Sequence, residues 1–493
     1  MQSERLAEHD VQYQKNLSQR KVSDKAKRTP GRKKQLKTKS LKISQCMIVK
    51  NEENNIRQAL SWGKEIMWEQ IVVDTGSADR TVQIAEELGA KVCHYVWTDD
   101  FAAAKNFAIG QAKGDWIALL DADEYMTSED ARKIQEVLIE LEEREFDGLS
   151  TNLQNLNDEG EAFSFGTQVR FFRNDPDIRY RRRIHEQLET VSGRKLRIGD
   201  ATQELSIFHT GYQKKAMEGK EKKGRNRRLI LAELDENPND YEMMGYMGDD
   251  CLADGESEEA TTWYRRSIQH MPSMLEPDDQ RSAMTFTEFL HLLTEKEALL
   301  GDGLRMDEIL GTYQRAIQLL PEEADFDYIL GRFFAMKNDM TRAIRHLEMA
   351  LSKLDRYGCY NKAMLLSGNV FDAYEILVRC YYETGEKQKC ISYAVNYLNY
   401  NRYGVEVLFW LLKALLPDEG GKEKGTMENG AAGENGEREK REVLEALSRL
   451  YDVTALKDKV ILVKTAEKAV GKDFSEFLLN QLFSQEERRR LGY

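Results

Sequence analysis

Short β-branched runs alternate with amphipathic stretches in the first half of the chain, beginning near residue 43. We predict strands at 43–50, 69–77, 91–97 and 115–124, and helices at 55–63, 78–89, 101–112 and 128–145. Strands that alternate with helices in this way are typical of a mostly parallel sheet covered by helices. Because further strands and turns are expected between 146 and 210, the first domain is predicted to span 43–215.

Strand signals stop after this domain, and the second half of the chain repeats itself. The segment YRRSIQHMP (264–272) matches YQRAIQLLP (313–321), and Ala316 lies 34 residues before Ala350. That interval is the period of the tetratricopeptide helix pair, whose units bury their apolar faces only by stacking on neighbours. We therefore predict helical repeats at 225–416, a flexible linker rich in Gly, Glu and Lys at 417–441, and closing helices at 442–493.

Charge is unevenly distributed along the chain. The 493 residues carry a formal net charge of -13, which argues against binding to nucleic acid. Residues 1–42, however, hold thirteen Lys or Arg and four Asp or Glu, with little apolar periodicity. We predict a disordered basic arm here, which is either a solvated tail or a weak electrostatic contact to anionic lipid or an acidic partner.

No run of about 20 apolar residues is present, and the first residues lack the order of a signal peptide. We therefore expect a soluble, cytoplasmic protein without a transmembrane segment. The cysteines form no CxxC pair and no Cys/His cluster at zinc spacing, so we expect reduced thiols. They are Cys46, Cys93, Cys251, Cys359, Cys380 and Cys390.

Acidic residues follow several of the predicted strands. Glu52 and Asp74 end the first two, and Asp121 and Asp123 end the fourth. Ligands of open parallel sheets lie beyond the carboxyl ends of the strands, so these acids are candidates for a site. On an extended chain Asp121 and Asp123 would point to the same side, where they could bind Mg²⁺ or Mn²⁺. Taken alone, such a triplet is more often a strand end with solvated acids.

Four motifs occur in order within 44–126: CMIVKNEENNI, IVVDTGSADRT, DDFAAAKNFAI and GDWIALLDADE. Their order and spacing resemble the N-terminal half of family 2 glycosyltransferases, and in particular a subgroup with a KNEE opening and a tetratricopeptide tail. VRFFRND (169–175), YRRRIHEQLE (180–189) and IFHTGY (207–212) also resemble motifs of this family. The resemblance covers 42–215 and implies an α/β GT-A domain, Rossmann-like with a mostly parallel sheet, followed by an all-α tetratricopeptide-like solenoid.

The resemblance also implies roles for individual side chains. The residues expected to bind the nucleotide sugar are Glu52, Asp74, Asp100, Lys105, Asn106 and Asp121. Glu52 and Asp74 would line the base and ribose pocket. The nucleotide and its diphosphate would be held by Asp100, Lys105 and Asn106. Asp121 would reach the ribose or the sugar. The commoner family pattern has Arg at position 105, so Lys105 keeps the charge but loses a bidentate fork. Asp123 and His209 are the implied ligands of Mn²⁺ or Mg²⁺, although a lone His after a strand is more often a surface or core residue.

An inverting transferase also needs a carboxylate that takes a proton from the acceptor. Glu186, in RIHEQL, matches the family's residue for this role. The rival interpretation makes Glu186 a helix-surface acid paired with Arg181, Arg182 or Arg183. One of these arginines could instead stabilise the leaving diphosphate, together with the cation. His185 is expected to support its neighbour.

The leading hypothesis is the inverting transfer of a hexose or N-acetylhexosamine from a UDP-sugar. A concave repeat surface commonly holds polypeptides, so we favour a peptide or protein acceptor, as in bacterial S-glycosyltransferases that modify a bacteriocin cysteine. A cell-surface or lipid-linked glycan is the alternative acceptor. A non-catalytic scaffold with a decayed transferase domain is disfavoured by the retained carboxylates, and a nucleotidyl- or phosphotransferase by the lack of a Gly-rich phosphate loop. The solenoid and C-terminal helices could also form a homodimer.

Overall fold

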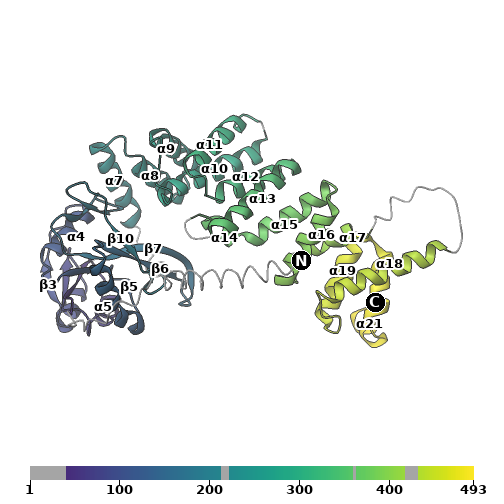
Figure 1. Ribbon diagram of the computed structural model, residues 1–493, viewed down its shortest axis with the longest axis horizontal. Coiled ribbons are helices and arrows are strands. Elements are labelled where there is room, and N and C mark those ends of the chain that lie inside the picture. The colour runs from purple at the N-terminus through teal and green to yellow at the C-terminus, as the bar shows by residue number, and fades with distance from the viewer. Residues whose placement is uncertain (1–39, 212–220, 302, 359–361, 417–430, 493) are drawn as a thin grey trace. The chain divides into compact units, whose positions relative to one another are not determined.

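The computed structural model describes residues 40–211, 221–301, 303–358, 362–416 and 431–492. These residues form two compact units, one ending at Glu256 and the other beginning at Ser257 (Figure 1). Most of the basic arm predicted at 1–42 lies outside the described residues. Leu41, the second-last residue of the predicted arm, is 2% exposed. The backbone N–H of Leu41 donates a hydrogen bond to Gln135 Oε1 at 3.2 Å. The core of the first unit therefore begins just before the first predicted strand.

The first unit is built on a sheet of nine described strands in the order β3-β2-β1-β4-β7-β6-β11-β5, with β10 also paired to β6. Strands β3, β2, β1 and β4 are parallel to one another, whereas β7 is antiparallel to both of its neighbours. The strands are β1 (Ile43–Val49), β2 (Glu69–Asp74), β3 (Lys91–His94), β4 (Trp116–Leu119), β5 (Glu124–Tyr125), β6 (Gly148–Leu156), β7 (Ala162–Arg173), β10 (Ile198–Asp200) and β11 (Ser206–His209). Strands β8 (Ile178–Arg181) and β9 (Gln187–Thr190) form a separate hairpin sheet. The predicted α/β GT-A-type domain followed by helices is confirmed.

Helices cover both faces of the parallel half of this sheet. Consecutive residues of a strand point to opposite faces, and in β4 both faces are buried. Ile117 packs in a cluster with residues of α4 (Phe101–Gly110), whereas Trp116 packs in another with residues of α5 (Ser128–Glu143). A third cluster holds α2 (Ile56–Ser61) and α3 (Thr81–Glu87) against β1 and β2. This packing fixes the carboxyl ends of β1, β2 and β4 at one edge of the domain.

Two helices beyond the predicted end of the first domain also belong to the first compact unit. They are α7 (Glu221–Glu236) and α8 (Tyr241–Ala253). The boundaries predicted at residues 215 and 225 stay predictions for the limits of the family domain, but compactness alone would divide the chain after Glu256.

The second unit is helical and fits a tetratricopeptide-like solenoid. Its helices are α9 (Ser257–His270), α10 (Gln280–Leu300), α11 (Met306–Leu319), α12 (Asp325–Met336), α13 (Met340–Tyr357), α14 (Met364–Gly368), α15 (Val370–Glu383), α16 (Lys387–Tyr400), α17 (Val405–Leu415), α18 (Ala431–Ser448), α19 (Leu456–Val470), α20 (Lys472–Leu482) and α21 (Gln485–Leu491). Consecutive helices such as α12 and α13 pack against each other. A Cβ on Gly331 of α12 would meet Leu347 of α13 at 2.5 Å, so the close approach of this pair requires glycine.

The predicted linker at 417–441 is only partly described. Residues 417–430 lie outside the described part, and α18 begins at Ala431, inside the segment predicted to be flexible. The abundance of Gly, Glu and Lys in this segment suggested flexibility. In α18, however, basic and acidic side chains one helical turn apart form ion pairs. Arg438 Nε, for example, donates to Glu442 Oε1 at 2.9 Å, and such pairs support a polar helix.

Two further expectations concern the cysteines and the membrane. The five cysteines in the described part of the chain are free thiols, as predicted, and Cys359 lies outside that part. Burial raises the pKa of the Cys390 thiol to about 11, which keeps it protonated at neutral pH. Of the helices described, none combines the length and apolar character that crossing a membrane requires.

Candidate active site

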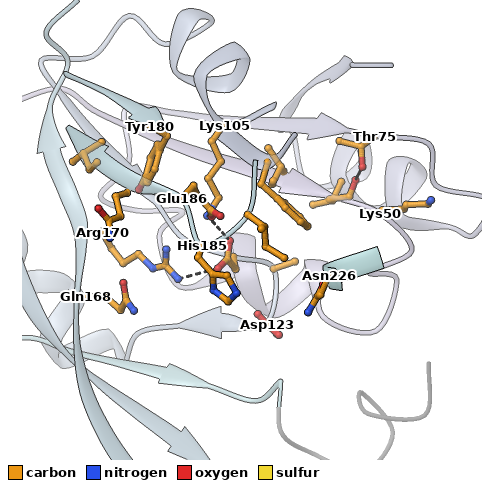
Figure 2. Close-up of a pocket in the computed structure, with 18 of the residues that line it drawn as sticks. Lys50, Thr75, Lys105, Asp123, Gln168, Arg170, Tyr180, His185, Glu186 and Asn226 are labelled. Atoms are coloured by element: carbon orange, nitrogen blue, oxygen red, sulfur yellow. Dashed lines mark hydrogen bonds and ion pairs between the residues drawn. The ribbon is translucent and has the colours of Figure 1, made fainter. Parts of the chain in front are cut away.

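A cavity of about 1480 Å³ lies at the carboxyl ends of β1 and β4 (Figure 2). Its walls also include residues of β7, of the β8–β9 hairpin and of helices α7 and α8. Pockets for a single small ligand usually measure about 300–1000 Å³, so this cavity has room for more than one. The residues predicted from the sequence that line it are Glu52, Lys105, Asp121, Asp123, Glu186 and His209.

Glu52 and Asp74 occupy different positions relative to this cavity. Glu52 lines it directly, whereas Asp74 is 5% exposed and accepts hydrogen bonds from the backbone N–H groups of Gly76 and Ser77, at 3.3 and 3.0 Å. Burial alone would raise the pKa of Asp74, but these hydrogen bonds hold it below its ordinary value. The carboxylate thus stiffens the turn after β2, and the next residue, Thr75, forms the cavity wall.

Asp121 and Asp123 both line the cavity, but they face different partners. The chain at Ala122 and Asp123 forms a turn, in which the N–H of Glu124 donates to the carbonyl oxygen of Asp121 at 3.0 Å. The extended conformation assumed from the sequence is therefore wrong here. The turn separates the two carboxylates, so that Asp121 meets basic residues and Asp123 meets His209.

A buried arginine joins Asp121 to a second acid. Arg170 of β7 is 9% exposed, and its Nη2 lies 2.8 Å from Asp121 Oδ2 and 2.6 Å from Glu124 Oε1. Burial raises the pKa of Glu124, and the neighbouring Asp121 adds to this effect. Burial alone would also raise the pKa of Asp121, but Lys105 and Arg170 hold it below its ordinary value. Arg170 lies in the VRFFRND segment that resembles a family motif, but it was assigned no role, because the acids that it pairs with follow another strand.

Lys105, on α4, lies between Asp121 and Glu186. Its Nζ is 2.5 Å from Glu186 Oε1 and 3.5 Å from Asp121 Oδ1, and it packs 5.3 Å from the centre of the Tyr180 ring (Figure 2). Burial alone would lower the pKa of Lys105, but the two carboxylates hold it above its ordinary value. Glu186 thus pairs with Lys105, whereas the rival interpretation paired it with the arginines at 181–183.

Asp123 and His209 form a second pair on another part of the wall. His209 Nε2 lies 3.3 Å from Asp123 Oδ2, and His209 Nδ1 lies 2.8 Å from Asn155 Oδ1. An amide oxygen only accepts, so Nδ1 carries a proton and Nε2 faces the carboxylate. Burial alone would lower the pKa of His209, but Asp123 raises it above its ordinary value. A Cβ on Gly211 would collide with both side chains, so glycine keeps this corner open.

The Asp123–His209 pair fits two ligands of one divalent cation. Oxygen and nitrogen ligands lie about 2.1 Å from Mg²⁺ or a similar ion, which places neighbouring ligand atoms roughly 3 Å apart. The hydrogen bond from Nδ1 to an acceptor also fixes the imidazole in the tautomer that binds metal through Nε2.

Asp100 and Asn106 do not line the cavity but support its walls. The Asp100 carboxylate accepts the N–H of Ala103 at 2.8 Å and so caps the start of α4. The Asn106 side chain donates to the carbonyl oxygen of Tyr180 at 2.8 Å and accepts the N–H of the same residue at 2.9 Å. Both polar side chains thus position the helix that carries Lys105.

Two arginines of the β8–β9 hairpin attach α7 and α8 to the α/β domain. Arg182 Nη2 lies 3.2 Å from Asp240 Oδ2, and the other end of its guanidinium pairs with Glu242. Arg183 pairs with Glu236 of α7. The arginine run therefore holds two helices against the domain, which is a structural role that the sequence did not predict.

The attached helices bring side chains into the cavity wall. His185 stacks on Tyr246 of α8, with ring centres 3.5 Å apart and planes at 2°. Helix α7 contributes Gly224, Arg225, Asn226 and Arg228 to the lining. These residues were not predicted, because the chain from 225 onward was assigned to helical repeats that were expected to stand apart from the nucleotide-sugar site. The available signal was two arginines three positions apart, which share one helix face.

The arginine contacts lead to a prediction about stability. Arg182→Ala is expected to lower the free energy of unfolding of the first unit by about 2 kcal/mol, because it leaves the half-buried acids Asp240 and Glu242 without their cation. Arg181→Ala is the matched control, since Arg181 is 54% exposed and pairs with the exposed Glu189, so it should change stability by less than about 0.5 kcal/mol. Denaturant unfolding measures both, and equal effects would contradict the assigned role.

Comparison with known proteins agrees with the family that the sequence motifs indicate. The profile of "Glycosyl transferase family 2" matches residues 44–217. A TPR repeat-containing protein of Synechococcus elongatus is 32% identical over 282 residues, which cover 56% of this chain and 66% of that protein. The SPbeta prophage-derived glycosyltransferase SunS of Bacillus subtilis is 25% identical over 335 residues, which cover 66% of this chain and 76% of that protein.

Likenesses to solved structures are more distant. Staphylococcus aureus TarS is 16% identical, with a TM-score of 0.30 and coverage of 55% of each chain. Glucosyl-3-phosphoglycerate synthase of Mycobacterium tuberculosis is 20% identical, with a TM-score of 0.20 and coverage of 24% of this chain and 45% of that chain. Scores this low support no conclusion about the ligands of this chain. The ordered motifs, the mostly parallel sheet and the profile match do place residues 44–217 in glycosyl transferase family 2.

Proposed function

We propose that this protein is a metal-dependent, inverting glycosyltransferase that moves a hexose or N-acetylhexosamine from a UDP-sugar to an acceptor. The observation that carries the proposal is that one cavity holds two acids in contrasting surroundings. Asp123 lies against His209, and Glu186 lies against Lys105. The Asp123–His209 pair is suited to binding a cation. The Glu186 carboxylate could accept a proton. Sugar transfer from a nucleotide donor uses both.

Asp123 and His209 would hold the divalent cation, Mn²⁺ or Mg²⁺. When bound, such a cation neutralises charge on the departing diphosphate. Asp121, held by Lys105 and Arg170, would accept hydrogen bonds from ribose or sugar hydroxyls. Two cations, Lys105 and Arg170, hold Asp121, whereas Lys105 alone pairs with Glu186, so of the two carboxylates we assign Asp121 to positioning the donor.

The nucleoside would lie beside Glu52 and the turn that follows β2. Asp74 does not line the cavity, but its hydrogen bonds fix this turn. It would therefore contribute to donor binding indirectly, by holding Thr75 in the cavity wall. Asp100 and Asn106 would likewise support the nucleotide site by fixing α4 and β8, in place of the direct contacts expected from the sequence.

Glu186 would act as the general base. As the acceptor's hydroxyl or thiol attacks the anomeric carbon, its proton passes to the Glu186 carboxylate, and the bond between that carbon and the diphosphate oxygen breaks. UDP then leaves with the bonding electrons. Lys105 is the positioning residue in this step, because its buried ammonium holds the Glu186 carboxylate at the cavity wall.

The acceptor we favour is a peptide or protein side chain. The support is the solenoid-like helical unit, since stacked helix pairs commonly present a surface for polypeptides. A cell-surface or lipid-linked glycan is the alternative. Intact-mass spectrometry after incubation with unstructured peptides or with saccharides discriminates between the two, and labelling of saccharides alone would reject the peptide proposal.

Thermal unfolding with nucleotide sugars tests the proposal as a whole. A ligand that binds only the folded protein stabilises it by about 2.7 kcal/mol at a concentration 100 times its Kd, so a UDP-sugar with Mn²⁺ should raise Tm by several degrees. The same UDP-sugar with EDTA should give a smaller shift, and GDP-sugars should give little. Absence of a shift with every nucleotide sugar would favour the scaffold hypothesis.

A further inference from the structure

The part of α7 nearest the cavity carries two arginines and an asparagine, none of which the family motifs contain. Arg225, Asn226 and Arg228 all line the cavity. Figure 2 shows Asn226 on the same side as Lys50 and Thr75, opposite Arg170 and Tyr180. The attachment of α7 through Arg183 keeps this wall in place. The cavity is thus bounded on one side by basic and amide groups that come from outside the family domain.

The two arginines of this wall differ in their partners. Arg228 Nη2 lies 2.8 Å from Asp99 Oδ1. Arg225, by contrast, lies over the Phe101 ring at 5.1 Å and donates to Asn226 Oδ1, with Nη2 at 3.1 Å and Nε at 3.3 Å. Within the described residues no carboxylate forms an ion pair with Arg225. Burial and the nearby charge of Arg228 lower the pKa of Arg225, as expected of a cation that an anion would stabilise.

The other buried cations of the cavity are already neutralised. Lys105 pairs with two carboxylates, and so does Arg170. Among the described residues that line the cavity, Arg225 is therefore the half-buried cation that remains available to bind an anionic ligand. Arg225 lies over Phe101, at the start of the helix that follows β3, and the Phe101 N–H donates to the carbonyl oxygen of Arg183 on the hairpin that carries Glu186. Arg225 thus lies where the strand ends that would bind the nucleotide approach that hairpin, which is where the diphosphate between nucleoside and sugar would lie. Glu186, where the acceptor would react, pairs with Lys105 instead.

We propose that Arg225, supported by Asn226, forms a subsite on α7 for the diphosphate of the nucleotide donor. This inference rests on the proposed function. A guanidinium presents a planar fork of donors that matches phosphate oxygens bidentately, and Asn226 adds an amide of its own. The donor site then extends beyond residues 44–217, and a helix that follows the family domain completes it.

Calorimetric titration of the full-length protein with UDP and with uridine, both in the presence of Mn²⁺, tests this subsite. Arg225→Ala should raise the Kd for UDP by about ten- to hundredfold, which is the loss expected for charge-assisted hydrogen bonds, and should leave uridine binding unchanged. Arg225→Lys should lie between wild type and Arg225→Ala, because it keeps the charge and loses the fork. Arg57→Ala is the charge-matched control, since Arg57 is 60% exposed and does not line the cavity.

The outcomes separate this inference from the proposed function. If the wild type binds UDP and Arg225→Ala binds it equally well, the subsite is rejected and the function stands. An equal loss of UDP and uridine affinity would also reject it, since α7 would then contact the nucleoside. Unchanged UDP binding with a raised KM for the acceptor would assign Arg225 to the acceptor and reject the diphosphate subsite. Failure of the wild type to bind UDP would overturn the function and the subsite together.

Discussion

Glu186→Gln is expected to lower kcat for sugar transfer by about 10²- to 10⁴-fold, the usual contribution of a positioned general base. Glutamine keeps the shape of the side chain but cannot take the proton of the acceptor. UDP affinity should change by less than about threefold, because the donor's nucleotide would lie beside Glu52, Thr75 and Asp123. Steady-state kinetics with saturating acceptor and calorimetric titration with UDP measure the two quantities separately.

A neighbouring acid provides the control for this experiment. Glu189 lies on the same hairpin, is 45% exposed and pairs with Arg181, and it does not line the cavity. Glu189→Gln should therefore retain nearly all activity. If Glu186→Gln lost no more activity than Glu189→Gln, Glu186 would not be the base, and its pairing with Lys105 would be structural. A parallel loss of UDP affinity would instead indicate that the variant disturbs the cluster around Lys105.

The fold was predictable because its signals are local and regular. The run Trp116–Leu119 is apolar at every position and all of it is buried, as expected for a central parallel strand. Once the strands are parallel, their carboxyl ends meet at one edge, so the acids after β1, β2 and β4 had to lie near one another. The Gly331–Leu347 contact likewise packs the consecutive helices α12 and α13 against each other, as expected of the helix pairs predicted at 225–416.

The partners of each acid could not be predicted in the same way. The sequence pattern predicts that Asp121 lies at the end of a strand. It does not predict the turn at Ala122, or that Asp121 pairs with Arg170 of a strand far away in the sequence. Lys105 and Glu186 meet only because α4 and the hairpin pack side by side, with Asn106 joining them through backbone groups. Such pairings depend on side-chain packing between segments far apart in sequence. A single sequence carries no signal for them.

Asp123→Asn is expected to lower kcat/KM for sugar transfer roughly 10²- to 10³-fold, because it removes the carboxylate proposed to bind the cation. The affinity for Mn²⁺, measured in the presence of UDP, should fall with it. His209→Ala should have a similar effect, and the double variant should lose little more than either single variant, since both side chains would bind one ion. Glu129→Gln is the control, as Glu129 is an 82% exposed acid at the start of α5.

The pH dependence of metal binding distinguishes a ligand role from a structural one. Asp123 raises the pKa of His209 above its ordinary value of 6.5, and a cation can bind Nε2 only after the imidazole loses its second proton. Mn²⁺ affinity of the wild type should therefore increase as pH rises through this raised pKa. Asp123→Asn removes the charge that raises the pKa, so the weaker binding that remains should reach its plateau at a lower pH. If the pH dependence were identical in both proteins, His209 would not be a ligand, and Asp123 would bind the cation with other partners.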